Sequence, residues 1–198
     1  MAAKDPTLSY YAKNAEAFAA STVDVDFSET QRRFAELLPP GARVLDLGCG
    51  SGRDSRAFLD MGFDVTATDG SPELAAIAER TAGIPVRVEL FQELSDVGAY
   101  DGVWACSSIL HLPKDQLADA LRRVERALVP GGVLYTSFKH GDSEGERNGR
   151  HFTDFTEPTF REFVSASCGL AVEDLWVSGD VRPGRGDERW LNALLRKA

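Results

Sequence analysis

Residues 43–55, RVLDLGCGSGRDS, combine a carboxylate, three alternating glycines and an arginine. Gly48, Gly50 and Gly52 leave backbone N–H groups bare where a predicted strand leads into a predicted helix. A helix N-terminus carries about half a positive elementary charge, so a carboxylate or phosphate can bind there. Asp69 ends the next β-branched run, 17 residues after Gly52, near the offset of about 20 residues at which a carboxylate binds ribose hydroxyls. These residues predict a site for a nucleoside-containing cofactor.

A dinucleotide is one cofactor that a glycine-rich turn of this kind can bind. The dinucleotide fingerprint G-x-G-x-x-G, started at Gly48, needs a glycine where this chain has Arg53, which is too large for the close helix–strand contact. Started at Gly50, the fingerprint ends at Ser55, which is sterically tolerable. An NAD-linked oxidoreductase therefore stays open as an alternative. So does a protein that binds a nucleoside cofactor without catalysing a reaction.

Side chains outside the glycine loop could activate or bind a substrate. His111, in SSILHLP, follows a predicted strand and is placed to remove a proton from a hydroxyl or an amine, although it could equally shape the pocket floor. Two later segments, KHGDSEGERNGRHF and GDVRPGRGDERW, carry cations that could converge on an anionic substrate: Lys139, Arg150, Arg182 and Arg185. Acidic residues are interleaved with them, so ordinary surface ion pairs worth about 0–1 kcal/mol each are the alternative.

Composition limits the partners that we expect. The 198 residues include 22 Lys+Arg and 31 Asp+Glu, and the net charge of −9 disfavours nucleic acid. No run of about 18 apolar residues is present, so we expect no membrane partner, and the lack of a signal-peptide core predicts a cytoplasmic location. Scattered cysteines and histidines predict no metal site. We expect a small-molecule substrate and a monomer or weak homodimer.

Strand and helix patterns alternate along the chain. Strand patterns occupy residues 43–47, 64–69, 85–90, 100–110 and 133–140. Helical patterns between them occupy residues 53–63, 71–83 and 114–132. The second of these has Ser71 as N-cap, Pro72 at the first helical position and Gly83 as a stop. The alternation predicts an α/β fold, a Rossmann-like three-layer sandwich whose mostly parallel seven-stranded sheet binds ligands at its carboxyl edge.

The last third of the chain departs from this alternation. Residues 170–180 and 188–197 read as strands without an intervening helix, which predicts an antiparallel hairpin. Residues 141–155 are polar and predict a loop over the carboxyl edge, and residues 156–167 predict a capped helix.

We expect a single domain, residues 1–198, in three parts. Residues 1–40 form two cap helices over the carboxyl edge, with helical patterns at 6–22 and 28–41. Residues 43–138 form the cofactor-binding core. Residues 139–198 form the substrate-side loop, helix and hairpin.

Taken together, the motifs resemble those of class I S-adenosylmethionine-dependent methyltransferases. VLDLGCGSG is similar to the family's first motif, VTATDGS to its acidic second motif and YDGVWACSSILHLP to its fourth. LRRVERALVPGGVLY resembles the helix and strand that follow. The resemblance covers roughly residues 43–138. Within it, the sequence GRDS at residues 52–55 is similar to a variant of the first motif in small methyltransferases that resemble tellurite-resistance enzymes. It implies S-adenosylmethionine as cofactor and in-line methyl transfer to a small-molecule acceptor.

The resemblance also implies roles for individual residues. Backbone of the glycine loop would lie against the methionine portion, Asp46 would help to hold the ammonium group, and Asp69 would accept hydrogen bonds from both ribose hydroxyls. Arg53 would pair with the methionine carboxylate, with a surface arginine as the alternative. The residues implied to bind the cofactor are Tyr11, Asp46, Gly48, Cys49, Gly50, Gly52, Arg53, Asp69, Gly70, Ser71, Gln92, Glu93, Cys106 and Ser107.

An N-terminal aromatic pair completes the expected site. We expect one of Tyr10 and Tyr11 beside the sulfonium, where a cation–π contact is worth about 0.5–2 kcal/mol. The alternative is that one tyrosine merely packs on the core. The substrate side would be formed by Tyr10, His111, Lys139, Arg150, Arg182 and Arg185. Oxygen, nitrogen, sulfur and heavier chalcogen acceptors all fit this architecture.

Overall fold

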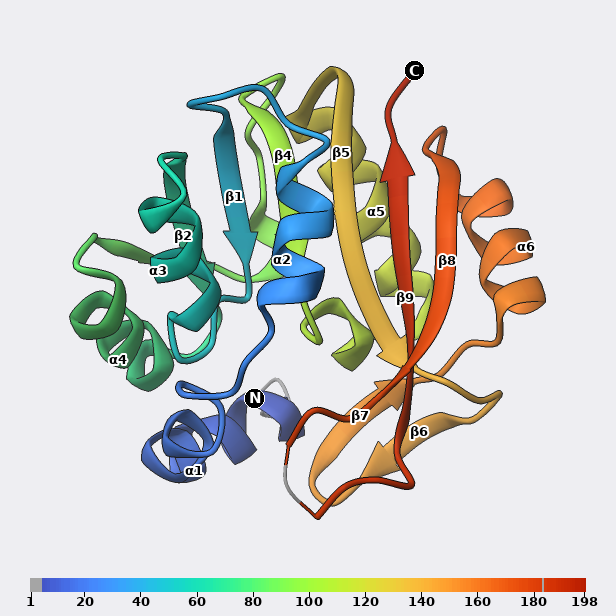
Figure 1. Ribbon diagram of the computed structural model, residues 1–198. Coiled ribbons are helices and arrows are strands. Elements are labelled where there is room, and N and C mark those ends of the chain that lie inside the picture. Colours follow the sequence, from blue (N-terminus) through green and yellow to red (C-terminus); the bar gives the residue numbers. More distant parts are fainter. Residues whose placement is uncertain (1–4, 183) are drawn as a thin grey trace.

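The computed structural model describes residues 5–182 and 184–198. Its main sheet has the strand order β3-β2-β1-β4-β5-β9-β8 (Figure 1). The strands are β1 (Arg43–Leu47), β2 (Asp64–Asp69), β3 (Val86–Val88), β4 (Tyr100–Ala105), β5 (Leu128–Lys139), β8 (Ala171–Gly179) and β9 (Arg189–Arg196). Strands β1 to β5 pair in parallel, whereas β9 runs antiparallel to both β5 and β8. The predicted Rossmann-like α/β sheet of seven strands with a C-terminal antiparallel hairpin is confirmed.

The helices begin within one residue of the predicted starts, but residues 128–132, expected at the end of the helix from residue 114, belong to β5. The helices are α1 (Pro6–Ala20), α2 (Ser28–Ala35), α3 (Arg53–Asp60), α4 (Pro72–Ala82), α5 (Lys114–Ala127) and α6 (Glu157–Ser167). In α4, the Ser71 hydroxyl accepts from the backbone N–H of Leu74 at 3.3 Å, Pro72 starts the helix, and Gly83 ends it at φ 76°. The predicted cap, start and stop of this helix are therefore confirmed.

Each face of the sheet packs against its own set of helices. Alternate residues of a strand point to opposite faces, so Leu45 and Leu47 of β1 join one apolar core with α5 and α6. On the other face, Val44 joins a second core with Phe34 of α2 and Phe58 of α3. Both faces are thus covered, as a parallel sheet requires.

Two further sequence-based expectations were wrong. Residues 141–155 contain a second sheet, the hairpin of β6 (Glu144–Arg147) and β7 (Arg150–Thr153), instead of a loop. Asn148 and Gly149 have φ values of 51° and 74°, as the two central residues of a type I′ hairpin turn require. Helix α2 lies on a sheet face and not over the carboxyl edge, because its fully buried Phe34 packs 5.2 Å from the Trp104 ring.

Helix α1 lies beyond the carboxyl edge, between α4 and the β6–β7 hairpin (Figure 1). Ala15 and Ala19 of α1 pack against Leu74 and Ile77 of α4. The expectation of an N-terminal helix over this edge is confirmed for α1. Among the described helices, none has the length and apolar character needed to cross a membrane.

Candidate functional site

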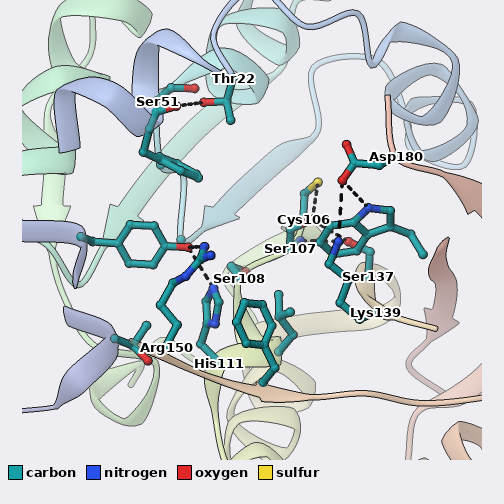
Figure 2. A pocket seen from close by; sticks show the side chains of 18 of the residues that line it. Thr22, Ser51, Cys106, Ser107, Ser108, His111, Ser137, Lys139, Arg150 and Asp180 are labelled. Atoms are coloured by element: carbon teal, nitrogen blue, oxygen red, sulfur yellow. Dashed lines mark hydrogen bonds and ion pairs between the residues drawn. The ribbon is translucent and has the colours of Figure 1, made fainter. Parts of the chain in front are cut away.

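A cavity of about 930 Å³ lies where β1, β2, β4 and β5 end. Its walls come from the glycine loop, the turns after β2 and β4, helix α1, the β6–β7 hairpin and the β8–β9 connection. Figure 2 shows Arg150 and His111 on one side of it and Lys139 and Asp180 on another. Residues predicted for the cofactor side, such as Gly48 and Asp69, and residues predicted for the substrate side, such as Arg150, line the same cavity.

The glycine loop has a backbone that only glycine adopts without strain. Gly48, Gly50 and Gly52 have φ values of 82°, 57° and 79°. A Cβ on Gly48 would lie 2.6 Å from Cβ of Ser108, and a Cβ on Gly52 would lie 2.9 Å from backbone atoms of Ala78. Gly48 and Gly50 line the cavity, whereas Gly52 lies against α4 and allows the close approach of α3.

Asp69, at the end of β2, presents a buried carboxylate to the cavity. Its two oxygens accept hydrogen bonds from the backbone N–H groups of Gly50, at 2.9 Å, and Ser71, at 2.8 Å. Burial raises the pKa of Asp69 despite these two donors. An ionised carboxylate offers about four lone-pair positions, so this one can accept further hydrogen bonds from a pair of ligand hydroxyls.

The turn after β4 forms the floor of the cavity. Ser107 has φ 52°, a left-handed conformation that costs a non-glycine residue about 1–3 kcal/mol, and its N–H donates to the Ser137 hydroxyl at 2.9 Å. The preceding Cys106 also lines the cavity. Burial raises the pKa of Cys106 to about 12 and raises that of Cys49 as well. Both thiols are therefore neutral, and neither is an activated nucleophile.

Asp46 lies behind the glycine loop and does not line the cavity. It accepts a hydrogen bond from the Ser55 hydroxyl at 2.5 Å. Burial and the neighbouring Asp54 raise the pKa of Asp46 to about 8. Direct contact with a cofactor ammonium group is absent from this geometry, so any such role must pass through the loop.

Asp54 is a buried, cavity-lining residue that the sequence analysis missed. It accepts hydrogen bonds from Gln31 at 2.6 Å and from the Trp104 indole at 2.8 Å, as well as two from Arg53 at 2.8 and 2.9 Å. Burial alone would raise the pKa of Asp54, but Arg53 and the hydrogen-bond donors hold it below its ordinary value. The cluster joins α2, α3 and β4 beneath the cavity. No local pattern signals it, because Gln31 and Trp104 are distant in sequence.

Arg53 lines the cavity, so it is not the surface arginine of the alternative interpretation. Its guanidinium forms an ion pair with Asp54 at 2.8 Å and lies 4.9 Å from the Phe27 ring centre. Its positive charge is therefore already matched within the chain, and pairing with a cofactor carboxylate stays a prediction.

Tyr11 and His111 meet on the opposite wall. The Tyr11 hydroxyl lies 2.9 Å from Nε2 of His111, and Nδ1 of His111 lies 2.7 Å from the carbonyl oxygen of His151. Arg150 donates to the Tyr11 oxygen at 3.4 Å and stacks over the Tyr10 ring at 4.4 Å. Burial lowers the pKa of His111 to about 4, so its imidazole is neutral at pH 7.

The other predicted substrate cations are paired with acids. Arg182 donates to Asp180 with its backbone N–H and its guanidinium, with contacts of 3.0, 2.9 and 2.6 Å. Lys139 pairs with Glu188 and lies 3.8 Å from the Trp190 ring centre. Arg185 pairs with Glu188 at 3.3 Å. These cations line the cavity, but their charges are matched by carboxylates, as the surface-pair alternative anticipated.

Most of the predicted site residues come together around one cavity. Those that line it are Tyr11, Gly48, Cys49, Gly50, Arg53, Asp69, Gly70, Gln92, Cys106, Ser107, His111, Lys139, Arg150, Arg182 and Arg185. Five do not line it: Tyr10, Asp46, Gly52, Ser71 and Glu93. Ser71 and Glu93 instead satisfy backbone N–H groups, those of Leu74 and Leu90.

Four phenylalanines of the cavity wall were also missed: Phe18, Phe27, Phe91 and Phe152. Phe18 follows Tyr11 by seven residues, and their ring centres lie 5.1 Å apart on one face of α1. Two helical turns separate them, so helical spacing was an available signal for Phe18.

Fold and site together define a Rossmann-like domain that binds a nucleoside-containing ligand at the carboxyl edge of its sheet. A family profile described as "Methyltransferase domain" matches residues 44–132. The ubiquinone biosynthesis O-methyltransferase of Xanthomonas axonopodis pv. citri (strain 306) is 31% identical over 167 residues, 73% of this chain and 68% of the relative. The chain belongs to the class I S-adenosylmethionine-dependent methyltransferases.

Coverage of some other curated relatives is smaller. Against the enzyme of the same name from Xanthomonas campestris pv. campestris (strain B100), identity is 38% over 110 residues, and the chain spans 45% of the relative's length.

Solved structures agree with the assigned family. The 1,6-didemethyltoxoflavin-N1-methyltransferase of Burkholderia thailandensis, solved with S-adenosylhomocysteine, gives a TM-score of 0.77 at 27% identity, covering 96% of this chain and 85% of that one. A TehB-like S-adenosylmethionine-dependent methyltransferase from Corynebacterium glutamicum gives 0.70 at 25% identity, covering 96% and 98%. Both likenesses extend over nearly all of this chain, and the second matches the resemblance to tellurite-resistance enzymes.

The residues present fit S-adenosylmethionine, the family's cofactor. Asp69 has acceptor capacity left for a ribose diol, and the backbone at Gly48 and Gly50 is bare beside it. Tyr11 and Phe18 supply aromatic rings on the same cavity, as a sulfonium favours. The NAD-linked alternative is set aside, because the family and the two solved relatives described above are methyltransferases.

Proposed function

We propose that the chain transfers a methyl group from S-adenosylmethionine to a hydroxyl oxygen of a small molecule. The observation that carries the proposal is that Asp69 and the Tyr11–His111 pair line the same cavity. A ribose-binding carboxylate thus faces the same space as a hydrogen-bonded pair that can take up a proton. The curated relatives are O-methyltransferases, which supports an oxygen acceptor.

When bound, S-adenosylmethionine supplies a methyl group on a sulfonium, and the acceptor's lone pair forms the new bond while the carbon–sulfur electron pair returns to sulfur. The chain contributes position and a dry environment. Helix α1 and the β6–β7 hairpin lie beside each other over the carboxyl edge, where Thr7 accepts from the His151 N–H at 3.1 Å. Orientation of two reactants in this way is worth about 7–11 kcal/mol.

Enclosure also favours a small acceptor. The same 930 Å³ must hold cofactor and acceptor, which leaves room for a compact molecule and not for a polymer. Among the described residues, Arg150 is the one cavity-lining cation of the predicted substrate set that forms no ion pair within 4.0 Å. An acceptor that develops negative charge on oxygen, such as a phenol, suits this arrangement.

A nitrogen acceptor is the second candidate. The Burkholderia thailandensis relative methylates a ring nitrogen according to its name, and its fold covers 96% of this chain. A neutral amine or ring N–H also has to lose a proton, so the same Tyr11–His111 pair would serve it.

Methyl transfer to a mixed panel of catechols, hydroxybenzoates, aminophenols and N-heterocycles, followed by mass spectrometry, tests the proposal. Oxygen methylation of at least one phenol is the expected result. Methylation confined to nitrogen would move the assignment to the second candidate. Calorimetric binding of S-adenosylhomocysteine with no methylated product across the panel would favour a non-catalytic binding protein.

A further inference from the structure

The hydrogen bonds around Tyr11 form a chain whose direction is fixed at both ends. A carbonyl oxygen only accepts, so Nδ1 of His111 must carry the proton that it shares with the His151 carbonyl at 2.7 Å. Nε2 of a neutral His111 is then an acceptor, and the Tyr11 hydroxyl at 2.9 Å must be its donor. A guanidinium only donates, so Arg150 points a proton at the Tyr11 oxygen.

These directions leave one position for a ligand. A phenolic oxygen has one proton and two lone pairs. His111 takes the proton and Arg150 takes one lone pair, which leaves the second lone pair as a hydrogen-bond acceptor in a residue that lines the cavity. A group that donates a hydrogen bond, such as an acceptor O–H, fits this position.

We infer that Tyr11 is the catalytic residue that receives the acceptor's proton, while its own proton passes to Nε2 of His111. The inference rests on the proposed function and adds the proton route to it. The acceptor oxygen keeps the electron pair of its O–H bond and uses it for the new bond to carbon. One proton leaves the acceptor and one arrives at His111, so Tyr11 starts and ends neutral. His111 then returns its proton to solvent after product release.

Burial keeps Tyr11 and His111 neutral at rest, and with a pKa of about 4 His111 holds the transferred proton only transiently. Burial raises the pKa of Tyr11, which keeps the phenol protonated at rest. Arg150 lines the cavity and lies beside the Tyr11 oxygen. Its positive charge would stabilise transient negative charge on the acceptor oxygen.

Helix α1 makes the relay conditional on its own docking. Tyr11 belongs to α1 and His111 to a short 3₁₀ helix (Ile109–His111) one hundred positions later in the chain. Thr7 of α1 also accepts from the backbone N–H of His151, the residue whose carbonyl orients the imidazole. Docking of α1 therefore brings the Tyr11 hydroxyl to His111 and also contacts the residue that orients the His111 ring.

Methyl acceptors of different acidity distinguish a role of Tyr11 in proton transfer from a role in packing alone. Tyr11→Phe keeps the ring and removes the hydroxyl, and Tyr100→Phe removes a hydroxyl bonded to Asp96 at 3.1 Å outside the cavity. With weakly acidic catechol as acceptor at pH 7, we expect Tyr11→Phe and His111→Gln to lower kcat by about 100-fold or more. With 4-nitrocatechol, which is already partly ionised, we expect the loss to shrink to less than about tenfold. Tyr100→Phe should match the parent chain with both.

An equal loss of kcat with both acceptors would overturn the relay and leave Tyr11 a packing role.

A second readout needs no turnover: the ¹⁵N shifts of His111, in the complex with S-adenosylhomocysteine, report which nitrogen carries the proton. Nδ1–H is expected, and Nε2–H would overturn the relay even if oxygen methylation is observed. If Nδ1–H is found but only nitrogen substrates turn over, the oxygen assignment fails. The relay then stands only if the variants slow weakly acidic N–H acceptors more than acidic ones.

Discussion

The Tyr11 hydroxyl donates to Nε2 of His111 over 2.9 Å and so joins the first helix of the chain to the turn after β4. The same tyrosine ring packs edge-on against Phe18 at 5.1 Å and against His111 at 5.6 Å. An N-terminal aromatic helix therefore closes over the cavity through both packing and a polar contact. Tyr11 and Phe18 of this helix line the cavity that the predicted cofactor and substrate residues share.

Asp69 provides the most direct test of cofactor binding by substitution. Asp69→Asn removes the charge and one acceptor oxygen, and hydrogen bonds to charged groups are worth about 1.5–3 kcal/mol each. We expect S-adenosylhomocysteine to bind roughly 10- to 150-fold more weakly by calorimetry. Asp60→Asn, at an exposed residue of α3 that pairs with Arg56, is the control and should bind normally. Equal affinity of the Asp69 variant would remove this residue from the site.

Gly52 of the glycine loop and Gly41, which precedes β1, give a paired prediction on stability. Gly41 and Gly52 have similar φ values of 71° and 79°, but a Cβ on Gly41 meets nothing within 4 Å, whereas one on Gly52 meets the Ala78 backbone at 2.9 Å. Gly41→Ala should cost about 1–3 kcal/mol of unfolding free energy from strain alone. Gly52→Ala should cost clearly more, because α4 must shift. Equal losses in urea unfolding would contradict the close packing described.

Asp46 and Asp54 are neighbouring buried acids, but their substitutions should affect the free energy of unfolding differently. Asp54 accepts four hydrogen bonds, two of which form its ion pair with Arg53, so Asp54→Ala should cost about 3–5 kcal/mol, as breaking a buried pair does. Asp46 has a pKa raised to about 8, so its contribution is greatest at acid pH and is lost as pH rises toward 8. Asp46→Asn should therefore gain stability relative to the parent chain between pH 5 and pH 8. Urea unfolding at both pH values measures this, and no change in the difference would show that Asp46 is already ionised.

The buried His111 should make the folded chain less stable as the pH falls. Burial lowers its pKa to about 4, so the folded chain binds this proton less readily than the unfolded chain. Its contribution is complete above the ordinary histidine pKa of about 6.5 and is lost as pH falls toward 4. Arg150 and His151 on β7 and Asp5 before α1 also face the ring, so the informative quantity is the difference between His111→Gln and the parent chain. That difference should narrow between pH 6.5 and pH 4.5, and a constant difference would contradict a buried neutral imidazole.

Much of the fold was predictable because its signals are local. Ser71, Pro72 and Gly83 specify α4 within a dozen residues, and the glycine loop specifies the turn after β1. The β6–β7 hairpin was missed although Asn148–Gly149 is a strong type I′ signal, because the flanking residues are polar and lack strand alternation. Long-range contacts such as Trp104 to Asp54 and Tyr11 to His111 have no local pattern, since only folding brings them together.

A crystal structure with S-adenosylhomocysteine bound tests the central claim most directly. The account predicts the ribose hydroxyls within hydrogen-bond distance of the Asp69 carboxylate, the amino-acid portion along the backbone of Gly48 and Gly50, and the sulfur facing the side of the cavity that holds Tyr11. A ligand bound elsewhere, with Asp69 contacting only Gly50 and Ser71 as it does here, would contradict the account.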